Sequence, residues 1–227
     1  MTQDLPVLYD YWRSSASYRV RIALNLAGID YKPVVVNLLD GSHRAEPHLA
    51  RNPQGLVPAL EIDGERMFET GAITQYLCER YSPDRMGRSV GSPDRMAWLV
   101  WVHFAETISQ HTAALTQQHI ALREDHMRSP IVMKLEAARI GKCYDALEAR
   151  LSTPLENRDY LLTSGFSAAD ISVGQAVYMA RHFVKLDDHP SVAAWYERIT
   201  ERDSFEQALP EEGRLYAQDF YAPWPVE

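Results

Sequence analysis

Cysteine is scarce in this sequence and does not occur in any metal-binding pattern. Of 227 residues only Cys78 and Cys143 are cysteines, and each lies in a segment with a helical apolar pattern. There is no Cys-x-x-Cys motif, and the eight histidines are scattered rather than set at ligand spacing. Two cysteines permit one disulfide, but we interpret them as buried free thiols in a reducing compartment. We therefore expect a cytoplasmic protein without a bound metal.

Long apolar runs and excess positive charge are also missing. No stretch approaches the ~20 consecutive apolar residues of a membrane-spanning helix, and the first residues lack the pattern of a secretory signal. Lysine and arginine number 23 against 31 acidic residues, a net charge of −8. Because a nucleic-acid-binding protein needs a basic face, we expect neither nucleic acid nor a membrane as partner. An anionic substrate would need a local group of arginines.

The first eighty residues alternate strand-like and helix-like patterns. The expected elements begin with a strand at 7–9 and a helix that follows the polar segment 13–15 and stops at Gly28. Next come a strand at 31–36 and a short helix or loop at 41–50. Strands at 57–62 and 66–68 around an Asp63-Gly64 turn and a helix at 70–81 complete this part. The helix between the first two strands implies a parallel pair, and the tight turn implies an antiparallel pair. This pattern predicts a small α/β layer.

The pattern changes after this layer. Residues 82–92 are rich in Ser, Pro, Gly and charge, as in a linker. Helical patterns then follow at 93–122, 131–151, 167–183 and 191–202, and the third is apolar nearly all round, which predicts a buried central helix. Ser167 and Asp170 at its start form a capping box, which we interpret as structural. We expect three parts, 1–82, a linker 83–92, and an all-helical domain 93–227.

A serine-rich segment, Arg13-Ser14-Ser15-Ala16-Ser17, leads from the first strand into the first helix. Free N–H groups and the positive end of the dipole make a helix start attractive to anions. If the anion is a thiolate, a serine hydroxyl can donate a hydrogen bond to it. Lowering a thiol pKa of ~8.5 by ~2 units requires ~2.7 kcal/mol. One charge-assisted hydrogen bond (~1.5–3 kcal/mol) and a dipole contribution (~0.3–1 kcal/mol) supply this. The alternative is that Ser14 and Ser15 only cap the helix.

Two further features lie at element ends in the same sheet. Val57-Pro58 opens a strand; if its peptide bond is cis, the Val57 main chain is free to pair with an extended peptide, although trans is the commoner form. Glu69-Thr70 precedes a helix, where a hydroxyl and free N–H groups can hold a carboxylate while the glutamate faces an ammonium group. This combination suits a γ-glutamyl group, whereas Thr70 alone is typical of an N-cap.

Together these motifs resemble those of glutathione transferases, specifically the zeta class, which includes maleylacetoacetate and maleylpyruvate isomerases. The string S-S-x-x-x-R-V-R-I-A-L at residues 14–24 is typical of that class. Matches to the wider superfamily are Tyr11-Trp12-Arg13, Asn37-Leu38-Leu39, Asn52-Pro53, Val57-Pro58 and Glu69-Thr70. The capping box at residues 167–170 also matches, so the resemblance extends over the whole chain.

The resemblance implies an α/β plus all-α protein, in which a thioredoxin-like N-terminal domain precedes a helical-bundle domain. It also implies a homodimer with glutathione as cofactor. By position, Ser14 corresponds to the thiolate-stabilising serine, and Ser15 is the second catalytic candidate. The residues implied to bind glutathione are Ser14, Ser15, Ala16, Ser17 and Arg19 at the thiol end, His43 at the glycine end, Val57 and Pro58 at the main chain, and Glu69 and Thr70 at the γ-glutamyl end.

The sequence departs from the zeta pattern at several positions. Ala16 stands where the class usually has cysteine, and Glu69-Thr70 replaces the usual Gln-Ser pair. In the helical half, Ser109-Gln110-His111 replaces the expected pocket segment, and Arg181 lies about one position from the class's arginine. Thiolate activation by Ser14 is compatible with these changes, while the substrate stays open.

The implied activity is a glutathione-dependent cis–trans isomerisation of a maleyl-type diketo acid. The thiolate adds to the cis double bond, the resulting single bond rotates, and glutathione leaves. Arg13 is a candidate for holding the substrate carboxylate, with Arg181 and His111 as further candidates. An ion pair with Asp10 or with a partner subunit is the alternative for Arg13, and we expect Arg19 and Arg21 to be structural or interface charges.

Two other functions stay open. One is a conjugating transferase or peroxidase acting on a hydrophobic electrophile, with aromatic and methionine side chains of the helices around its pocket. The other is a non-catalytic interaction protein built on the same fold. A pure scaffold does not need Ser14, Val57-Pro58 and Glu69-Thr70 together, which favours an enzyme.

Overall fold

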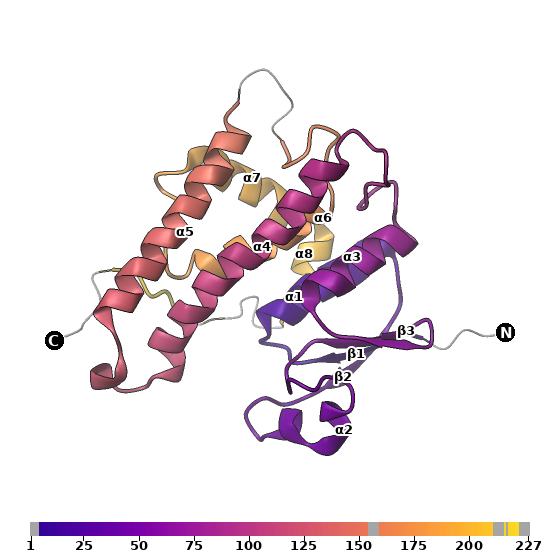
Figure 1. Cartoon of the computed structure of the whole chain (residues 1–227), viewed down its shortest axis with the longest axis horizontal. Helices are drawn as coiled ribbons and strands as arrows, with labels where there is room; N and C mark the ends of the chain where they lie inside the picture. The colour runs from indigo at the N-terminus through magenta and orange to yellow at the C-terminus, as the bar shows by residue number, and fades with distance from the viewer. Residues whose placement is uncertain (1–4, 154–158, 211–215, 217, 223–227) are drawn as a thin grey trace. The chain divides into compact units, whose positions relative to one another are not determined.

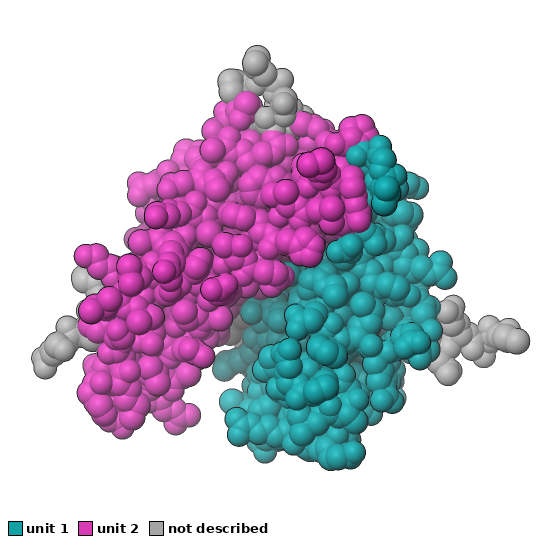
Figure 2. Space-filling view, viewed as in Figure 1, with its two compact units in different colours: residues 1–92, 202–215 teal, residues 93–201, 216–227 magenta. Residues whose placement is uncertain are grey.

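The computed structural model describes residues 5–153, 159–210, 216 and 218–222. The chain divides into two units, coloured separately in Figure 2. Among the described residues, unit 1 comprises 5–92 and 202–210, and unit 2 comprises the rest. Residues 202–210 thus belong to unit 1, although they follow the helices of unit 2 along the chain.

Unit 1 contains a mixed four-stranded sheet in the order β2-β1-β3-β4. The strands are β1 Val7–Asp10, β2 Lys32–Val35, β3 Ala59–Ile62 and β4 Glu65–Met67. Strand β1 pairs parallel with β2 and antiparallel with β3, and β3 pairs antiparallel with β4, so both predicted kinds of pairing are confirmed. Strand β3 begins two residues later than predicted, because Pro58 has no N–H to contribute to the ladder.

Helices cover both faces of this sheet. In Figure 1, α1 (Ser15–Ala27) and α3 (Thr70–Tyr81) lie on one face, and α2 (Glu46–Leu49) lies on the other. A short 3₁₀ turn, η1 (Ser42–Arg44), precedes α2, and α8 (Asp203–Glu206) contacts α1. The core under α1 and α3 consists of Leu8, Val20, Ala23, Leu24, Leu60, Ile62, Ile73 and Leu77. Helix α1 ends at Gly28, whose left-handed φ of 66° confirms the predicted glycine stop.

Among the described residues of unit 2, all the regular secondary structure is helical. Its elements are α4 (Arg95–Thr116), a π-helical turn η2 (Gln117–Ala121), a 3₁₀ turn η3 (Asp125–Met127), α5 (Pro130–Leu151), α6 (Ala168–Ala180) and α7 (Pro190–Thr200). The four predicted helices are confirmed, with ends that shift by one to several residues. Every residue of α6 is buried, as its all-round apolar pattern predicts. None of the helices in the described part of the chain is long and apolar enough to cross a membrane.

The predicted capping box of α6 is confirmed and has additional partners. The hydroxyl of Ser167 accepts the N–H of Ala169, while the Ser167 N–H donates to Asp170 Oδ2 at 2.9 Å. The other oxygen of Asp170 accepts the Leu161 N–H at 3.0 Å and the indole N–H of Trp195 at 2.9 Å. Asp170 therefore joins the start of α6 to the preceding loop and to α7.

Candidate functional site

The N-terminus of α1 is an open group of hydrogen-bond donors. Ser14 is its N-cap residue, and its Oγ accepts the Ser17 N–H at 3.2 Å. A hydroxyl that accepts in this way still has its own proton to donate. Among the described residues, the N–H groups of Ser15 and Ala16 have no acceptor. Because Ser14, Ser15 and Ala16 are only half-buried, this end of α1 can bind an anion, and Ser14 can both cap the helix and donate to that anion.

Val57 and Pro58 lie immediately before β3. The Val57-Pro58 peptide bond is cis rather than the commoner trans form. The side chains of both residues are buried, that of Val57 in a cluster with Tyr9, Tyr11 and Ala59. Within the described part of the chain, neither the N–H nor the C=O of Val57 has a hydrogen-bond partner. Its main chain is therefore available to an extended peptide.

The start of α3 is a second group of open donors. Thr70 is not the N-cap that its sequence context suggested: Glu69 is, and Thr70 is the first helical residue. No side chain caps this end, so the N–H groups of residues 70–72 have no acceptor among the described residues. Glu69 has a φ of 73°, a conformation that is strained for a residue with a side chain and recurs at binding sites. Its carboxylate accepts Gln54 Nε2 at 3.3 Å.

The other residues implied at the glutathione site differ in accessibility. His43 lies in η1, half-buried, and its Nδ1 is buried without a partner in the described structure. Ser17 and Arg19 lie on the buried side of α1, 0% and 1% exposed. The main-chain N–H of Ser17 is the group that bonds Ser14. Both side chains are therefore buried, unlike the half-buried residues at the start of α1.

Arg13 and Arg21 have different environments. Arg21 Nη1 donates to Asp10 Oδ2 at 2.6 Å, and its Nε donates to the Ala208 carbonyl at 2.7 Å. Asp10 thus pairs with Arg21 and not with Arg13, so the intrachain alternative for Arg13 is wrong and the structural role expected for Arg21 is confirmed. The Arg13 guanidinium is exposed and stacks on Trp12, with its Cζ 4.7 Å from the ring centroid. It lies next to Ser14 in the chain.

The two substrate candidates of the helical half both lie in unit 2. His111 on α4 is hydrogen-bonded through Nδ1 to Glu136 of α5 at 2.7 Å, which links the two helices. Arg181, at the end of α6, has its Cζ 5.2 Å from the ring centroids of both Tyr178 and Tyr196, as in cation–π contacts. The Nε of Arg181 is buried and has no hydrogen-bond partner in the described structure.

Neither cysteine is available as a nucleophile. Cys78 and Cys143 are free thiols, and both are buried, as the sequence predicted. Burial raises the pKa of both thiols, which keeps them protonated and unreactive at neutral pH. The described residues contain no group of three or more His, Cys, Asp or Glu side chains placed to hold a metal ion.

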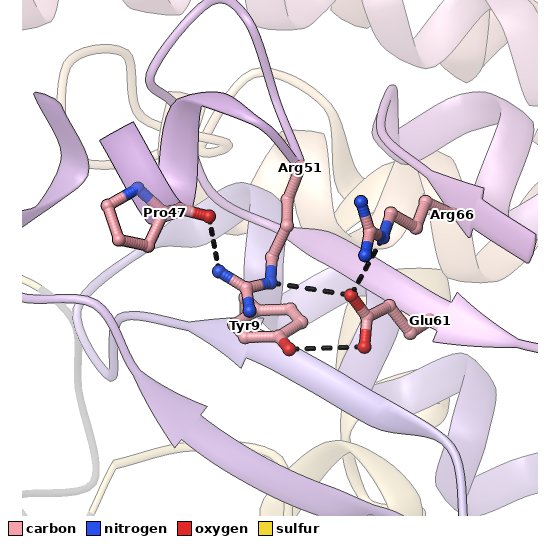
Figure 3. Close-up of polar contacts among 5 residues, drawn as sticks. All are labelled: Tyr9, Pro47, Arg51, Glu61 and Arg66. Atoms are coloured by element: carbon pink, nitrogen blue, oxygen red, sulfur yellow. Dashed lines mark hydrogen bonds and ion pairs between the residues drawn. The ribbon is translucent and has the colours of Figure 1, made fainter. Parts of the chain in front are cut away.

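Sequence patterns missed a polar cluster that attaches α2 to the sheet (Figure 3). Glu61 on β3 accepts the Tyr9 hydroxyl at 3.1 Å, Arg51 Nε at 3.3 Å and Arg66 Nε at 3.0 Å. Arg51 also donates to the carbonyl of Pro47, and its Cζ lies 4.3 Å from the centroid of the Tyr9 ring. The pairing of Tyr9 with Ala59 makes Tyr9 and Glu61 diagonal neighbours on one face. That neighbourhood depends on strand register, for which the sequence offers no local signal.

Comparison with known proteins identifies the family. Family models for the glutathione S-transferase N-terminal and C-terminal domains match residues 8–85 and 113–198. Glutathione S-transferase Z2 of Arabidopsis thaliana is 31% identical over 210 residues, which cover 90% of this chain and 90% of that protein. The chain belongs to the glutathione S-transferase family.

Two further relatives indicate the class. The maleylacetoacetate isomerase of Rhizobium meliloti is 70% identical over 73 residues, 32% of this chain and 34% of that enzyme. The chain spans only about a third of the length of the curated isomerases that it matches. The holo structure of a maleyl pyruvate isomerase, a bacterial zeta-class glutathione S-transferase, is 27% identical with a TM-score of 0.74, over 90% of this chain and 96% of that one. The fold is that of glutathione transferases, and the likeness reaches the zeta class.

Proposed function

We propose that this protein is a zeta-type glutathione transferase that uses glutathione as a coenzyme to isomerise a maleyl-type diketo acid. One observation carries the proposal. The Ser14 hydroxyl caps α1 by accepting the Ser17 N–H, which leaves its proton for a thiolate beside the open N–H groups of Ser15 and Ala16. Two isomerase matches support the reaction: one is 70% identical over 73 residues, and the other, 27% identical, is a zeta-class structure that matches 90% of this chain.

The groups at the ends of α1, α3 and β3 have separate roles in this proposal. The Val57 main chain pairs with the cysteinyl residue of glutathione, and the open N–H groups at α3 hold the γ-glutamyl carboxylate, with Glu69 near its ammonium group. His43 binds the glycine end. Arg13 holds a carboxylate of the diketo acid, and Arg181 and His111 are proposed to contribute from unit 2. The thiolate attacks the cis double bond, whose electron pair moves onto the conjugated carbonyl as an enolate. After rotation about the new single bond, the enolate pair restores the double bond, and the C–S bond breaks with its electron pair returning to the thiolate.

Variants at Ser14 test the proposal without confusing activity with folding. Ser14→Gly removes the hydroxyl, yet glycine is a good N-cap and changes helix stability by only a few tenths of a kcal/mol. We expect it to raise the thiol pKa of bound glutathione by about 2 units and to lower isomerisation about 100-fold. Ser14→Thr keeps a hydroxyl and should restore much of the activity. The measurements are the ultraviolet absorbance of the thiolate against pH and turnover of maleylacetoacetate or maleylpyruvate with catalytic glutathione.

Glutathione conjugation is the second candidate, because curated relatives that match over most of the chain are named glutathione S-transferases. The same assay separates the two. An isomerase leaves the glutathione concentration unchanged, whereas a conjugating enzyme consumes one glutathione per product. A wild-type protein that neither binds glutathione nor lowers its thiol pKa would contradict both and leave the non-catalytic alternative.

The assembly and location are proposed on the same basis. We infer a cytoplasmic homodimer with a thioredoxin-like domain at 1–82, a linker at 83–92 and a helical domain at 93–227, of which the described residues 202–210 group with unit 1. Sedimentation velocity of the purified chain distinguishes a dimer from a monomer, and a monomer that retains full activity would contradict this assignment.

A further inference from the structure

The carbonyl of Leu56, immediately before Val57, accepts hydrogen bonds from two buried side chains. His48 Nε2 lies 2.9 Å and Asn52 Nδ2 lies 2.8 Å from the Leu56 oxygen. The two side chains are 4% and 3% exposed. Because a carbonyl oxygen only accepts, Nε2 of His48 must bear the proton. Nδ1 is then a buried acceptor, and it has no partner among the described residues.

The segment between these two residues and Val57 is tightly held. Asn52 Oδ1 accepts the Gln54 N–H at 3.1 Å, and the Asn52 carbonyl accepts the Gly55 N–H at 2.9 Å. Gly55 has a φ of 64°, and a Cβ there would lie 3.0 Å from the His43 carbonyl oxygen. Only glycine fits this conformation and this space. The path of the chain into Val57 is therefore closely determined.

Hydrogen bonds connect the segment 51–57 both to the sheet and to the start of α3. At one end, Arg51 joins α2 to Glu61 and to the Tyr9 ring (Figure 3), and the Tyr9 ring lies 6.5 Å from that of His48. At the other end, Gln54 Nε2 bonds the Glu69 carboxylate at the start of α3. The segment 52–57 thus links the Val57 main chain to the open donors of α3.

We propose that His48 and Asn52 are positioning residues for glutathione. They hold the Leu56 carbonyl so that the N–H and C=O of Val57 stay available to an extended tripeptide thiol, and they determine its affinity rather than the rate of the chemical step. Neither side chain touches the reacting sulfur in this proposal. The inference rests on the proposed function, since the ligand is the same glutathione.

Two substitutions of His48 separate the hydrogen bond from packing. His48→Phe keeps an aromatic ring in the buried site but removes the donor. His48→Gln places an amide nitrogen the same number of bonds from Cα as Nε2, so it can donate to Leu56. We expect the Phe variant to raise KM and Kd for glutathione about 3- to 10-fold, as one hydrogen bond would, with kcat within about twofold. The Gln variant should recover most of the affinity, and exposed His126→Phe is the matched control.

A spectroscopic measurement gives a readout that does not depend on activity. The Val57 amide nitrogen is bonded to the Leu56 carbonyl carbon, so its resonance should move in His48→Phe and return in His48→Gln. If the Phe variant does not fold, Asn52→Ser removes the second donor, because serine is too short to reach, and should shift the same resonance and weaken glutathione binding.

The outcomes distinguish the two proposals. No binding of glutathione by the wild-type protein in calorimetry contradicts the proposed function and, with it, this inference. Normal wild-type binding that is unchanged in both His48→Phe and Asn52→Ser overturns the inference alone. Equal losses in the Phe and Gln variants, or a fall in kcat at constant KM, also overturn it, because hydrogen-bond positioning predicts neither.

Discussion

Arg13 and Arg21 lie eight residues apart in the same segment, but burial separates their roles. Arg21 is 8% exposed and donates to Asp10, to the Ala208 carbonyl and, at 3.3 Å, to the Trp12 carbonyl. Arg13 is exposed, and its one polar or cation–π contact to a described residue is the stacking of its guanidinium on Trp12. The sequence shows two similar arginines, and only the packed structure distinguishes the buried, hydrogen-bonded cation from the exposed one.

We expect Arg21→Ala to lower the free energy of unfolding by about 3–5 kcal/mol, because it leaves the buried Asp10 charge without its partner. Arg13→Ala should change it by no more than about 0.5 kcal/mol, as for other exposed side chains. Urea unfolding of both variants at constant m-value measures the difference. If both variants lose similar free energies of unfolding, the Asp10–Arg21 ion pair does not stabilise the fold as expected here.

Ser14 illustrates a residue for which two sequence interpretations are compatible. Capping and thiolate stabilisation are alternatives only if the hydroxyl has a single hydrogen bond to make. In the structure its oxygen accepts from Ser17, and its proton is directed to no acceptor among the described residues. One hydroxyl can therefore serve both roles.

The α6 capping box is the element whose stability should depend on pH in an unusual direction. Burial raises the pKa of Asp170 to about 6, although three hydrogen bonds favour its carboxylate. The unfolded value is about 3.9. Between these values the native state holds a proton that the unfolded state has lost, so the Asp170 contribution to the free energy of unfolding falls as pH rises.

Asp170→Asn tests this dependence. Asparagine is neutral at every pH and turns an NH₂ group toward one of the donors, so we expect the variant to be less stable by about 1–3 kcal/mol or more. The difference between wild type and variant should shrink from pH 4 to pH 6.5, by roughly 3 kcal/mol at most. Thermal or urea unfolding across this range measures it. A difference that grows with pH would mean that the folded-state pKa is lowered instead.

In the region around α2, the local sequence pattern predicted the secondary structure but not the tertiary contacts. The polar, irregular segment 41–50 was expected to be a short helix or a loop, and it contains η1 and α2. The hydrogen bonds that attach this segment to the rest of unit 1, His48 with Leu56 and Arg51 with Glu61, could not be predicted from the sequence pattern. The two hydrogen bonds join residues eight and ten positions apart in the chain. Both are between polar groups, so hydrophobic periodicity does not predict them.

At the level of the whole chain, unit 1 is completed by residues that come after unit 2. Phe205 packs edge-on against Tyr18 at 6.4 Å between ring centroids, and its carbonyl accepts the Tyr18 hydroxyl at 3.3 Å. Ala208 supplies the carbonyl for Arg21. The helices of unit 2 are thus an insertion between two segments of unit 1.

A fragment of residues 1–92 should therefore fold poorly by itself. It lacks the buried Phe205 ring and the carbonyls of Phe205 and Ala208, which accept hydrogen bonds from the Tyr18 hydroxyl and from Arg21 Nε. In the full chain, Phe205→Ala should cost about 3–5 kcal/mol and increase amide hydrogen exchange in β1 and α1. Circular dichroism and hydrogen exchange provide the measurements. A cooperatively folded fragment with protection equal to that of the full chain would contradict this account.

The sequence by itself determined the kinds of element, their order, the parallel and antiparallel pairings, the α6 cap and the segments of the candidate site. These follow from local causes: apolar periodicity, glycine and proline positions, and capping side chains within a few residues. Only the tertiary structure decided which arginine pairs with Asp10, that Val57-Pro58 is cis, that His111 bonds Glu136, and that residues 202–210 complete unit 1. Those outcomes depend on strand register, burial and contacts between distant segments, and short-range sequence patterns do not encode them.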